Sequence, residues 1–474
     1  MFNSNENRFK EYIIIVILSV FSLSIIFNNL GSTAYYDWDE SRHGENALEI
    51  LKTNDWVVLK YDDQTDLWNT KPPLGAWLIA ISFKILGVNE FALRFWSALF
   101  GAGTVVLVFL FGREIGNNCV GFFSALLLST NVLFIGYHGA RTGDYDVMVT
   151  FVITLSLYLF YLSQKKDNNT YLIGTALSIA LAVLIKGVVG LFPVLIIGIS
   201  LFYFKSLKAT IFSRQFKYGI LIFCIVALPW FILRFIAGSD FIIRMLNYDL
   251  LQRFNEPIEG HIGNWAFYFI GLQFLFGKIG FILLLLIFIY SIYLIKIGNK
   301  PLFILIIWIS VFIGTFTIAG SKLSWYMIPI YPAISLLIGF HLDDLQKLLK
   351  IKKSIFIAIF LILMIYPVFS IIEYTESIPY SPIKTSINGM KEELKEINVI
   401  YIHTRENRQS IFLYLNSYVK ENVILYSDFN NINASKGAAV ITFDSEIFNI
   451  LNKSKEYELV KVEKNAALFK KIRV

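Results

Sequence analysis

The sequence predicts a polytopic α-helical membrane protein that ends in a small soluble α/β domain, and three observations support this fold class. Apolar residues make up 56% of the 474 residues and charged residues only 16%, whereas soluble domains contain roughly 45–50% apolar residues. The apolar residues gather in runs, and a membrane-spanning helix needs roughly 20 of them. After about residue 374 the composition becomes polar, with Lys, Glu and Asn throughout.

Eleven apolar runs are candidate transmembrane helices. The first lacks a strongly basic start and is followed at once by an acidic loop, which favours a retained span over a cleaved signal peptide. Residues 74–87 are too short to cross the bilayer and predict a helix lying at its surface. The candidate spans lie at about 12–30, 91–112, 118–137, 147–163, 171–185, 187–204, 218–237, 279–295, 302–319, 325–341 and 354–372.

The charge of the connecting loops predicts the topology. Basic loops between spans face the cytoplasm, and here they lie at 164–166, 205–217, 296–300 and 347–353. The intervening loops, rich in Asp, His, Trp and Gly, are then extracytoplasmic, and an odd number of spans places the C-terminus there too. They lie at 31–90, 138–146, the turn at Lys186, 238–278 and 320–324. This pattern explains the net charge of +7 as membrane topology, so we expect no nucleic-acid partner.

The polar C-terminal part predicts an extracytoplasmic α/β domain over 374–474, after a transmembrane part over 1–373. Its apolar segments have strand or helix character, and we expect this domain to cover or shape the active side. The predicted strands are 398–404, 422–428 and 438–444, the helices 410–420 and 446–453, and a closing hairpin covers 458–474.

The first extracytoplasmic loop, within 31–90, is dense in carboxylates and Trp. Asp37, Asp39 and Glu40 follow the first span almost directly. A carboxylate fixed just outside the bilayer suits a general base that acts on a substrate held at the membrane surface. A solvated acidic loop start explains the spacing equally well.

Lys71 ends this loop and precedes two prolines, which hold the backbone extended and aim the side chain. A lysine presented in this way is a suitable phosphate ligand. The alternative is a lysine that extends to the headgroups.

Further candidates lie in the other extracytoplasmic loops. Arg141, Asp144 and Asp146 precede the fourth predicted span, where one aspartate is explained as a helix cap. Lys186 lies in a tight turn between two spans and is either an anion ligand or a headgroup contact. His261 has Glu256 and Glu259 nearby, although a single loop histidine usually has no special role.

These residues together resemble the membrane glycosyltransferases of GT-C type that include the lipid A aminoarabinose transferase and the protein O-mannosyltransferases. The resemblance covers about residues 10–345, and its segments occur in the family's order. They are WDESRHGENALEIL, K-P-P-L-G-x-W at 71–77, R-x-x-x-x-D at 141–146, L-I-K-G at 184–187, G-H-x-G-x-W at 260–265 and K-L-x-W-Y-x-x-P-x-Y-P at 322–332.

The resemblance implies the roles of individual residues. Asp39 is then the catalytic carboxylate and Asp146 the second motif acid, while Lys71, Lys186 and Arg253 hold the donor phosphate. The same pocket is expected to contain Glu40, Arg141, Asp144, His261 and Tyr326. Relatives close to the aminoarabinose transferase carry an acid where this chain has Thr70, so no cofactor is certain and a divalent metal stays possible.

The function implied is an inverting glycosyltransferase. It would move a sugar from a polyprenyl-phosphate donor to a hydroxyl of lipid A, a polysaccharide or a protein, at the periplasmic face of a bacterial inner membrane. The alternative is a transporter or flippase of lipid-linked sugars. Transporters place ionisable groups near the bilayer midplane, whereas the predicted span centres here carry no charge. This difference favours the enzyme.

Overall fold

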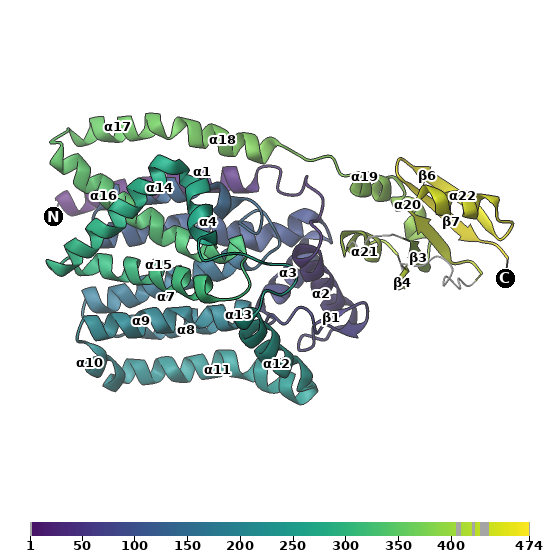
Figure 1. The fold of residues 1–474 in the computed structure, drawn as a ribbon, viewed down its shortest axis with the longest axis horizontal. Coiled ribbons are helices and arrows are strands. Elements are labelled where there is room, and N and C mark those ends of the chain that lie inside the picture. Colours follow the sequence, from purple (N-terminus) through teal and green to yellow (C-terminus); the bar gives the residue numbers. More distant parts are fainter. Residues whose placement is uncertain (1, 404–408, 420–421, 427–435, 474) are drawn as a thin grey trace.

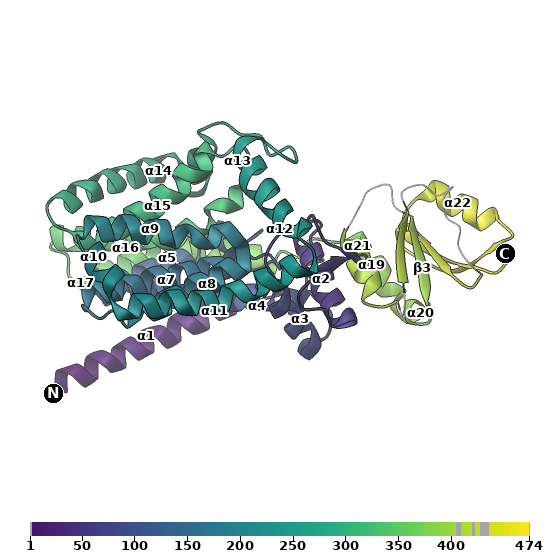
Figure 2. The ribbon, with the colours of Figure 1, turned by 90° about the horizontal axis from the view of Figure 1, so that it is seen from below.

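The computed structural model describes residues 2–403, 409–419, 422–426 and 436–473. Long helices form a bundle, and a mixed β-sheet lies beyond one end of it (Figure 1). Figure 2 shows the same division from a second direction, with α1 (Phe2–Phe27) along one side of the bundle. The chain is therefore a polytopic α-helical membrane protein with a small C-terminal α/β part, as predicted.

All eleven predicted spans are helical in the structure. Nine described runs are long and apolar enough to cross a membrane, and one of them, Tyr171–Tyr203, reverses direction at Gly187 (φ +51°). Beyond this turn Gly190 lies against the backbone of Ala182, so the run forms two antiparallel helices. Besides α1, the helices are α4 (Glu90–Ile115), α5 (Asn118–Ser129), α6 (Val132–Ile135), α7 (Asp146–Lys165), α8 (Tyr171–Lys186), α9 (Phe192–Tyr203), α11 (Arg214–Ala237), α14 (Phe267–Lys296), α15 (Lys300–Ile318), α16 (Tyr331–Leu348), α17 (Lys353–Leu363) and α18 (Ile365–Glu376).

Two predicted spans differ in detail from the structure. The span predicted at 279–295 follows a break at Gly277 (φ +68°, ψ 169°), and the segment from Phe267 to that break, predicted as loop, is helical as well; both helices are joined at this kink in α14. α5 has only 12 residues and stops at Ser129, where Asn131 caps the short α6 through the N–H groups of Leu133 and Phe134. A polar cap therefore decides where this second apolar run breaks.

Short elements fill the end of the bundle that carries the site. The predicted surface helix at 74–87 is present as α3 (Leu74–Leu86), packed against α2 (Asp39–Thr53) and α4. The others are β1 (Lys60–Tyr61), β2 (Gln64–Thr65), α12 (Asp240–Arg244), α13 (Arg253–Asn255), the 3-10 turns η1 (Gly187–Leu191) and η3 (Ser324–Ile330), and the π-helix η2 (Met245–Gln252); α10 (Leu207–Phe212) connects α9 to α11.

The two ends of the bundle differ in charge as predicted. The basic loops before α8, around α10, before α15 and before α17 gather at the end where the N-terminus lies (Figure 1). At that end Arg113 pairs with Glu11 and Glu114, and Lys165 pairs with Glu114. The acidic and aromatic loops lie at the opposite end, next to the C-terminal sheet.

The C-terminal sheet has five strands in the order β4-β3-β5-β7-β6. β3 (Val399–His403) pairs parallel with β4 (Asn422–Tyr426) and β5 (Ala439–Thr442), while β7 (Ala466–Lys471) pairs antiparallel with β5 and with β6 (Tyr457–Glu463). All three predicted strands and the hairpin are present, although their outermost residues at 404, 427–428 and 474 lie outside the described residues. The helices here are α19 (Pro382–Gly389), α20 (Lys391–Lys395), α21 (Gln409–Asn416) and α22 (Ser445–Lys453).

Candidate active site

A buried ion pair joins the loops that form the site. Glu40, near the start of α2, accepts hydrogen bonds from Arg94 Nε at 2.7 Å and Arg94 Nη2 at 2.9 Å, and both side chains are 1% exposed. The same carboxylate accepts the N–H groups of Gly143 at 2.8 Å and Tyr36 at 2.7 Å. Four donors satisfy the buried charge, as a stable buried carboxylate requires. Glu40 thereby holds the loop of Asp144 and Asp146 beside Asp39.

A second pair shapes the long first loop. Arg42 makes a bidentate contact with buried Asp66, with both N–O distances at 2.8 Å. Asp66 also accepts the backbone N–H groups of Trp68 at 3.0 Å and Asn69 at 2.9 Å. These bonds fix the backbone just before Lys71, which is aimed as the two prolines predict.

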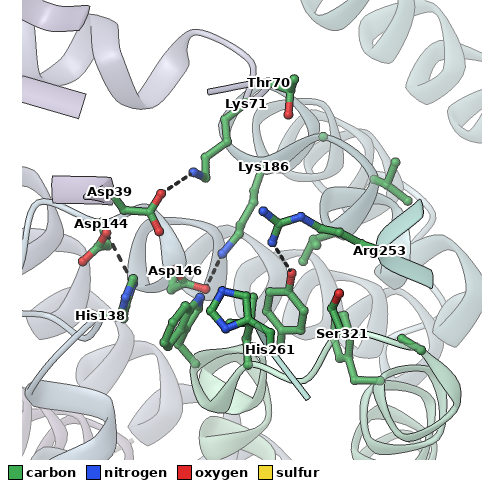
Figure 3. Close-up of a pocket in the computed structure, with 18 of the residues that line it drawn as sticks. Asp39, Thr70, Lys71, His138, Asp144, Asp146, Lys186, Arg253, His261 and Ser321 are labelled. Carbon is green, nitrogen blue, oxygen red and sulfur yellow. Dashed lines mark hydrogen bonds and ion pairs between the residues drawn. The ribbon is translucent and has the colours of Figure 1, made fainter. Parts of the chain in front are cut away.

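Two lysine–carboxylate pairs line the cavity (Figure 3). Lys71 Nζ lies 3.0 Å from Asp39 Oδ1, and each side chain is 23% exposed. Lys186, the last residue of α8, donates to Asp146, the first residue of α7. The fold thus brings together charges that are distant in the sequence: Lys71 and Asp39 are 32 residues apart, and Lys186 and Asp146 are 40 residues apart.

A third group of charges closes another side of the cavity. Arg253 donates to Tyr326 Oη and to Glu259, both at 3.2 Å. Glu259 also accepts from Trp68 Nε1 at 2.9 Å and lies 3.8 Å from His261 Nε2. Glu259 therefore ties the loop before α14 to the first loop.

The cavity between these groups has a volume of about 790 Å³. Its polar side carries the lysines, the arginine and the carboxylates just described. Its other side is apolar and comes from η1, α9, α13, α15 and the segment before η3; the apolar residues are Val188, Val189, Phe192, Phe254, Phe316, Ala319 and Leu323. The cavity can therefore accept a ligand with a charged head and an apolar tail.

The charges set the protonation states at the site. Burial alone would raise the pKa of Asp39, but Lys71 and two histidines outweigh it and lower the pKa below the usual range. Likewise, burial opposes charge on Asp144 and His138, yet their mutual contact lowers the pKa of Asp144 and raises the pKa of His138. Burial and Lys71 lower the pKa of His43 to about 4. Asp39 and Asp144 are therefore anionic, and His43 is neutral near pH 7.

Eight of the ten expected site residues line this cavity: Asp39, Lys71, Asp144, Asp146, Lys186, Arg253, His261 and Tyr326. Glu40 and Arg141, which were expected in the pocket, do not. Glu40 points to Arg94, and Arg141 Nη1 donates to the carbonyls of Ile26 at 2.8 Å and Asn28 at 2.5 Å, where α1 ends. A cation favourably closes a helix C-terminus, so the structure assigns both residues to holding the elements together.

Two histidines were missed. His138 lines the cavity, lies 3.3 Å from Asp144 Oδ1 and stacks on Trp325. His43 lies flat on Tyr145 with ring centroids 3.8 Å apart, and its Nδ1 donates to the carbonyl of Gly143 at 3.2 Å. Its Nε2 has no hydrogen-bond partner among the described residues. Three of the chain's five histidines line the cavity. The signal that could have found them was the small number of histidines and their place in loops predicted to be extracytoplasmic.

One group of side chains fits a divalent cation. Ligand atoms of Asp39, His138 and Asp144 all lie within 4.8 Å of one another. Two carboxylates and an imidazole suit Mn²⁺ or Zn²⁺. Thr70, at the position of the family's acid, also lines the cavity but adds no charge.

The sequence matches known proteins over most of its length. Residues 70–233 match the family described as dolichyl-phosphate-mannose-protein mannosyltransferase. An uncharacterised protein of Aquifex aeolicus is 30% identical over 349 residues, covering 72% of this chain and 66% of that protein. An undecaprenyl phosphate-alpha-4-amino-4-deoxy-L-arabinose arabinosyl transferase of Wigglesworthia glossinidia brevipalpis is 26% identical over 369 residues, covering 74% of this chain but only 62% of the transferase.

The fold is also that of a solved membrane enzyme. The structure of ArnT from Cupriavidus metallidurans bound to undecaprenyl phosphate superposes with a TM-score of 0.73 at 16% identity, covering 96% of this chain and 97% of that one. The similarity includes the C-terminal part, because almost the whole of both chains is matched.

Proposed function

The chain belongs to the membrane glycosyltransferase family that uses polyprenyl-phosphate sugars, and we propose that it transfers a sugar from such a donor to a hydroxyl acceptor. One observation carries the proposal: two lysine–carboxylate pairs face a single cavity that also has an apolar wall. An anionic head on an apolar chain matches these two sides.

The donor phosphate binds among Lys71, Lys186 and Arg253. Each cation already contacts an anion or a hydroxyl, and a phosphate offers stronger acceptor oxygens to all three. The polyprenyl chain lies along the apolar wall. When Lys71 turns towards the phosphate, it no longer neutralises Asp39, whose carboxylate becomes available as a base.

The transfer then proceeds in one displacement. Asp39 accepts the proton of the acceptor hydroxyl while the acceptor oxygen bonds to the anomeric carbon. The bond between that carbon and the phosphate oxygen breaks, and the electron pair leaves with the phosphate, whose added charge the cations stabilise. Attack from the opposite face inverts the anomeric centre. Phosphate is a good leaving group, so the acid of a glycosidase is not needed.

Four residues assist around this centre. Asp146 holds Lys186, and His261 and Tyr326 shape the donor side. His43 presents a neutral Nε2 from the same helix face as Asp39, four residues away, so it accepts a hydrogen bond from the acceptor. If a divalent cation binds Asp39, His138 and Asp144, it would add positive charge beside the phosphate.

The acceptor is a hydroxyl of lipid A, a surface polysaccharide or a protein, and the active side is the periplasmic face of a bacterial inner membrane. The basic loops at the opposite end of the bundle support this orientation. The transporter alternative gains no support, because the named relatives are transferases and the charged residues lie at helix ends.

Substitution of Asp39 tests the assignment. We expect Asp39→Asn to lower transfer by about 10²–10⁴-fold, because the amide cannot accept the proton. Polyprenyl phosphate should still bind, because the cations are unchanged. The matched control is Asp63→Asn, an exposed aspartate of the same loop outside the cavity. An Asp39→Asn protein as active as the control would refute the base.

A further inference from the structure

The backbone directly before Asp39 is strained. Trp38 has φ +69° and ψ −119°, a conformation that glycine adopts readily and a bulky residue does not. The residue is 59% exposed, so no closely packed interior surrounds it. Such a conformation persists only where the surroundings enforce it.

Helix α21, more than 370 residues away in the sequence, contacts this backbone. Gln409 Oε1 accepts the Trp38 N–H at 3.2 Å, and the Ser410 N–H donates to Asp37 Oδ1 at 2.9 Å. Tyr414 Oη accepts the Tyr35 N–H at 3.2 Å. All three bonds fall on the four residues that precede Asp39.

The rest of α21 is fixed to the membrane part as well. Tyr414 Oη donates to Glu90 at 2.7 Å, and Lys384 pairs with the same carboxylate at 2.8 Å. Asn416 Nδ2 donates to buried Glu45 at 2.9 Å. Leu413 packs directly over Gly44 of α2. These contacts fix α21 against the membrane part. The fixed helix can therefore hold residues 35–38 in one conformation.

We propose that α21 of the C-terminal part positions the catalytic carboxylate, with Gln409 and Tyr414 as positioning residues for Asp39. The inference rests on the proposed function, since it takes Asp39 as the base. A base must lie within hydrogen-bond reach of its proton, and a misplacement of about 1 Å lowers the rate by roughly 10²-fold. The C-terminal part is thus a component of the active site and not a separate appendage.

The test combines a structural and a catalytic readout on the full chain in nanodiscs. Gln409→Ala removes the acceptor of the Trp38 N–H, whereas Gln409→Glu keeps an acceptor oxygen at that place. Tyr414→Phe removes the hydroxyl that binds Tyr35 and Glu90. The matched control is Tyr418→Phe, because the Tyr418 hydroxyl donates to Asn388 within the C-terminal part. Hydrogen exchange at the Tyr35 and Trp38 amides is followed, together with kcat and donor KM.

We expect faster exchange in Gln409→Ala and Tyr414→Phe, a fall in kcat of about tenfold or more, and an unchanged donor KM. Gln409→Glu should restore both readouts, and Tyr418→Phe should match the wild type. Unchanged exchange, or faster exchange with full kcat, would overturn the proposal. If exchange rises but wild type transfers no sugar, the proposed function fails while the contact between α21 and residues 35–38 stands.

Discussion

The two neighbouring acids at the start of α2, Asp39 and Glu40, point in different directions and have different partners. Asp39 faces the cavity and Lys71, whereas Glu40 faces Arg94 in the protein interior. Consecutive positions on a helix point about 100° apart, so the carboxylate next to the proposed base points out of the cavity and towards Arg94. The motif predicted two acids at the site, and helix geometry leaves one.

Glu45 makes the stability of the folded protein depend on pH. Burial raises the pKa of Glu45 to about 8, against about 4.3 in an unfolded chain, so the folded protein favours the protonated acid. Stability from this group is fully present below pH 4 and is lost as the pH rises towards 8. We expect Glu45→Gln, neutral at every pH, to flatten the melting temperature between pH 5 and 8, measured by scanning fluorimetry in detergent.

The control is Glu392→Gln, at an exposed carboxylate paired with Lys395 on α20. It should follow the wild-type pH curve. A Glu45→Gln protein whose melting temperature falls with pH as steeply as the wild type would show that Glu45 is ionised in the folded state.

Residue types predicted most of the site but not all of it. The eight cavity residues were recognisable because each lies in a loop predicted to be extracytoplasmic or at a helix end. All of them except Arg253 also fall within a motif. His43 could also have been predicted from the sequence, since a histidine four residues after Asp39 lies on the same helix face. Arg141 was not, because its partners are backbone carbonyls of α1, more than 110 residues earlier.

Between elements, glycines set how closely the helices approach. A Cβ on Gly121 of α5 would lie 2.4 Å from the carbonyl oxygen of Phe109 on α4, and Gly112 of α4 contacts the Gly121 backbone. Small residues allow this approach in membrane helices.

We predict that Gly121→Ala lowers stability by about 1–3 kcal/mol, because the backbones must separate. Gly198→Ala in α9 is the matched control, since nothing lies within 4 Å of its Cβ position. It should melt at or slightly above the wild-type temperature. Equal melting of the two variants would contradict the close packing of α4 on α5.

The loop predicted at 238–278 contains a helical segment that begins at Phe267. Gly277 (φ +68°, ψ 169°) separates this segment from the span predicted at 279–295, so α14 consists of two helices joined at a kink. The break agrees with the predicted start of the span, whereas the helix before it was missed.

For the whole molecule, loop charge and apolar periodicity predicted the helical segments and the end at which the site lies. The docking of α21 was beyond sequence reasoning, since its contacts reach residues 35–38 and 45, far away in the sequence. Such contacts leave no local pattern. The contacts of α21 with residues 35–38 are the basis on which we propose that this part of the chain supports the site.

Separation of the sugar from a polyprenyl phosphate in this cavity is the step that defines the proposed activity. The most direct measurement uses purified protein in nanodiscs, an envelope extract as acceptor, and a donor labelled with ¹⁴C in the sugar and ³²P in the phosphate. We predict that the ¹⁴C moves to the acceptor while the ³²P stays on the lipid, and that Asp39→Asn moves neither. Joint movement of both labels, or transport of the intact donor across a bilayer without their separation, would contradict glycosyl transfer.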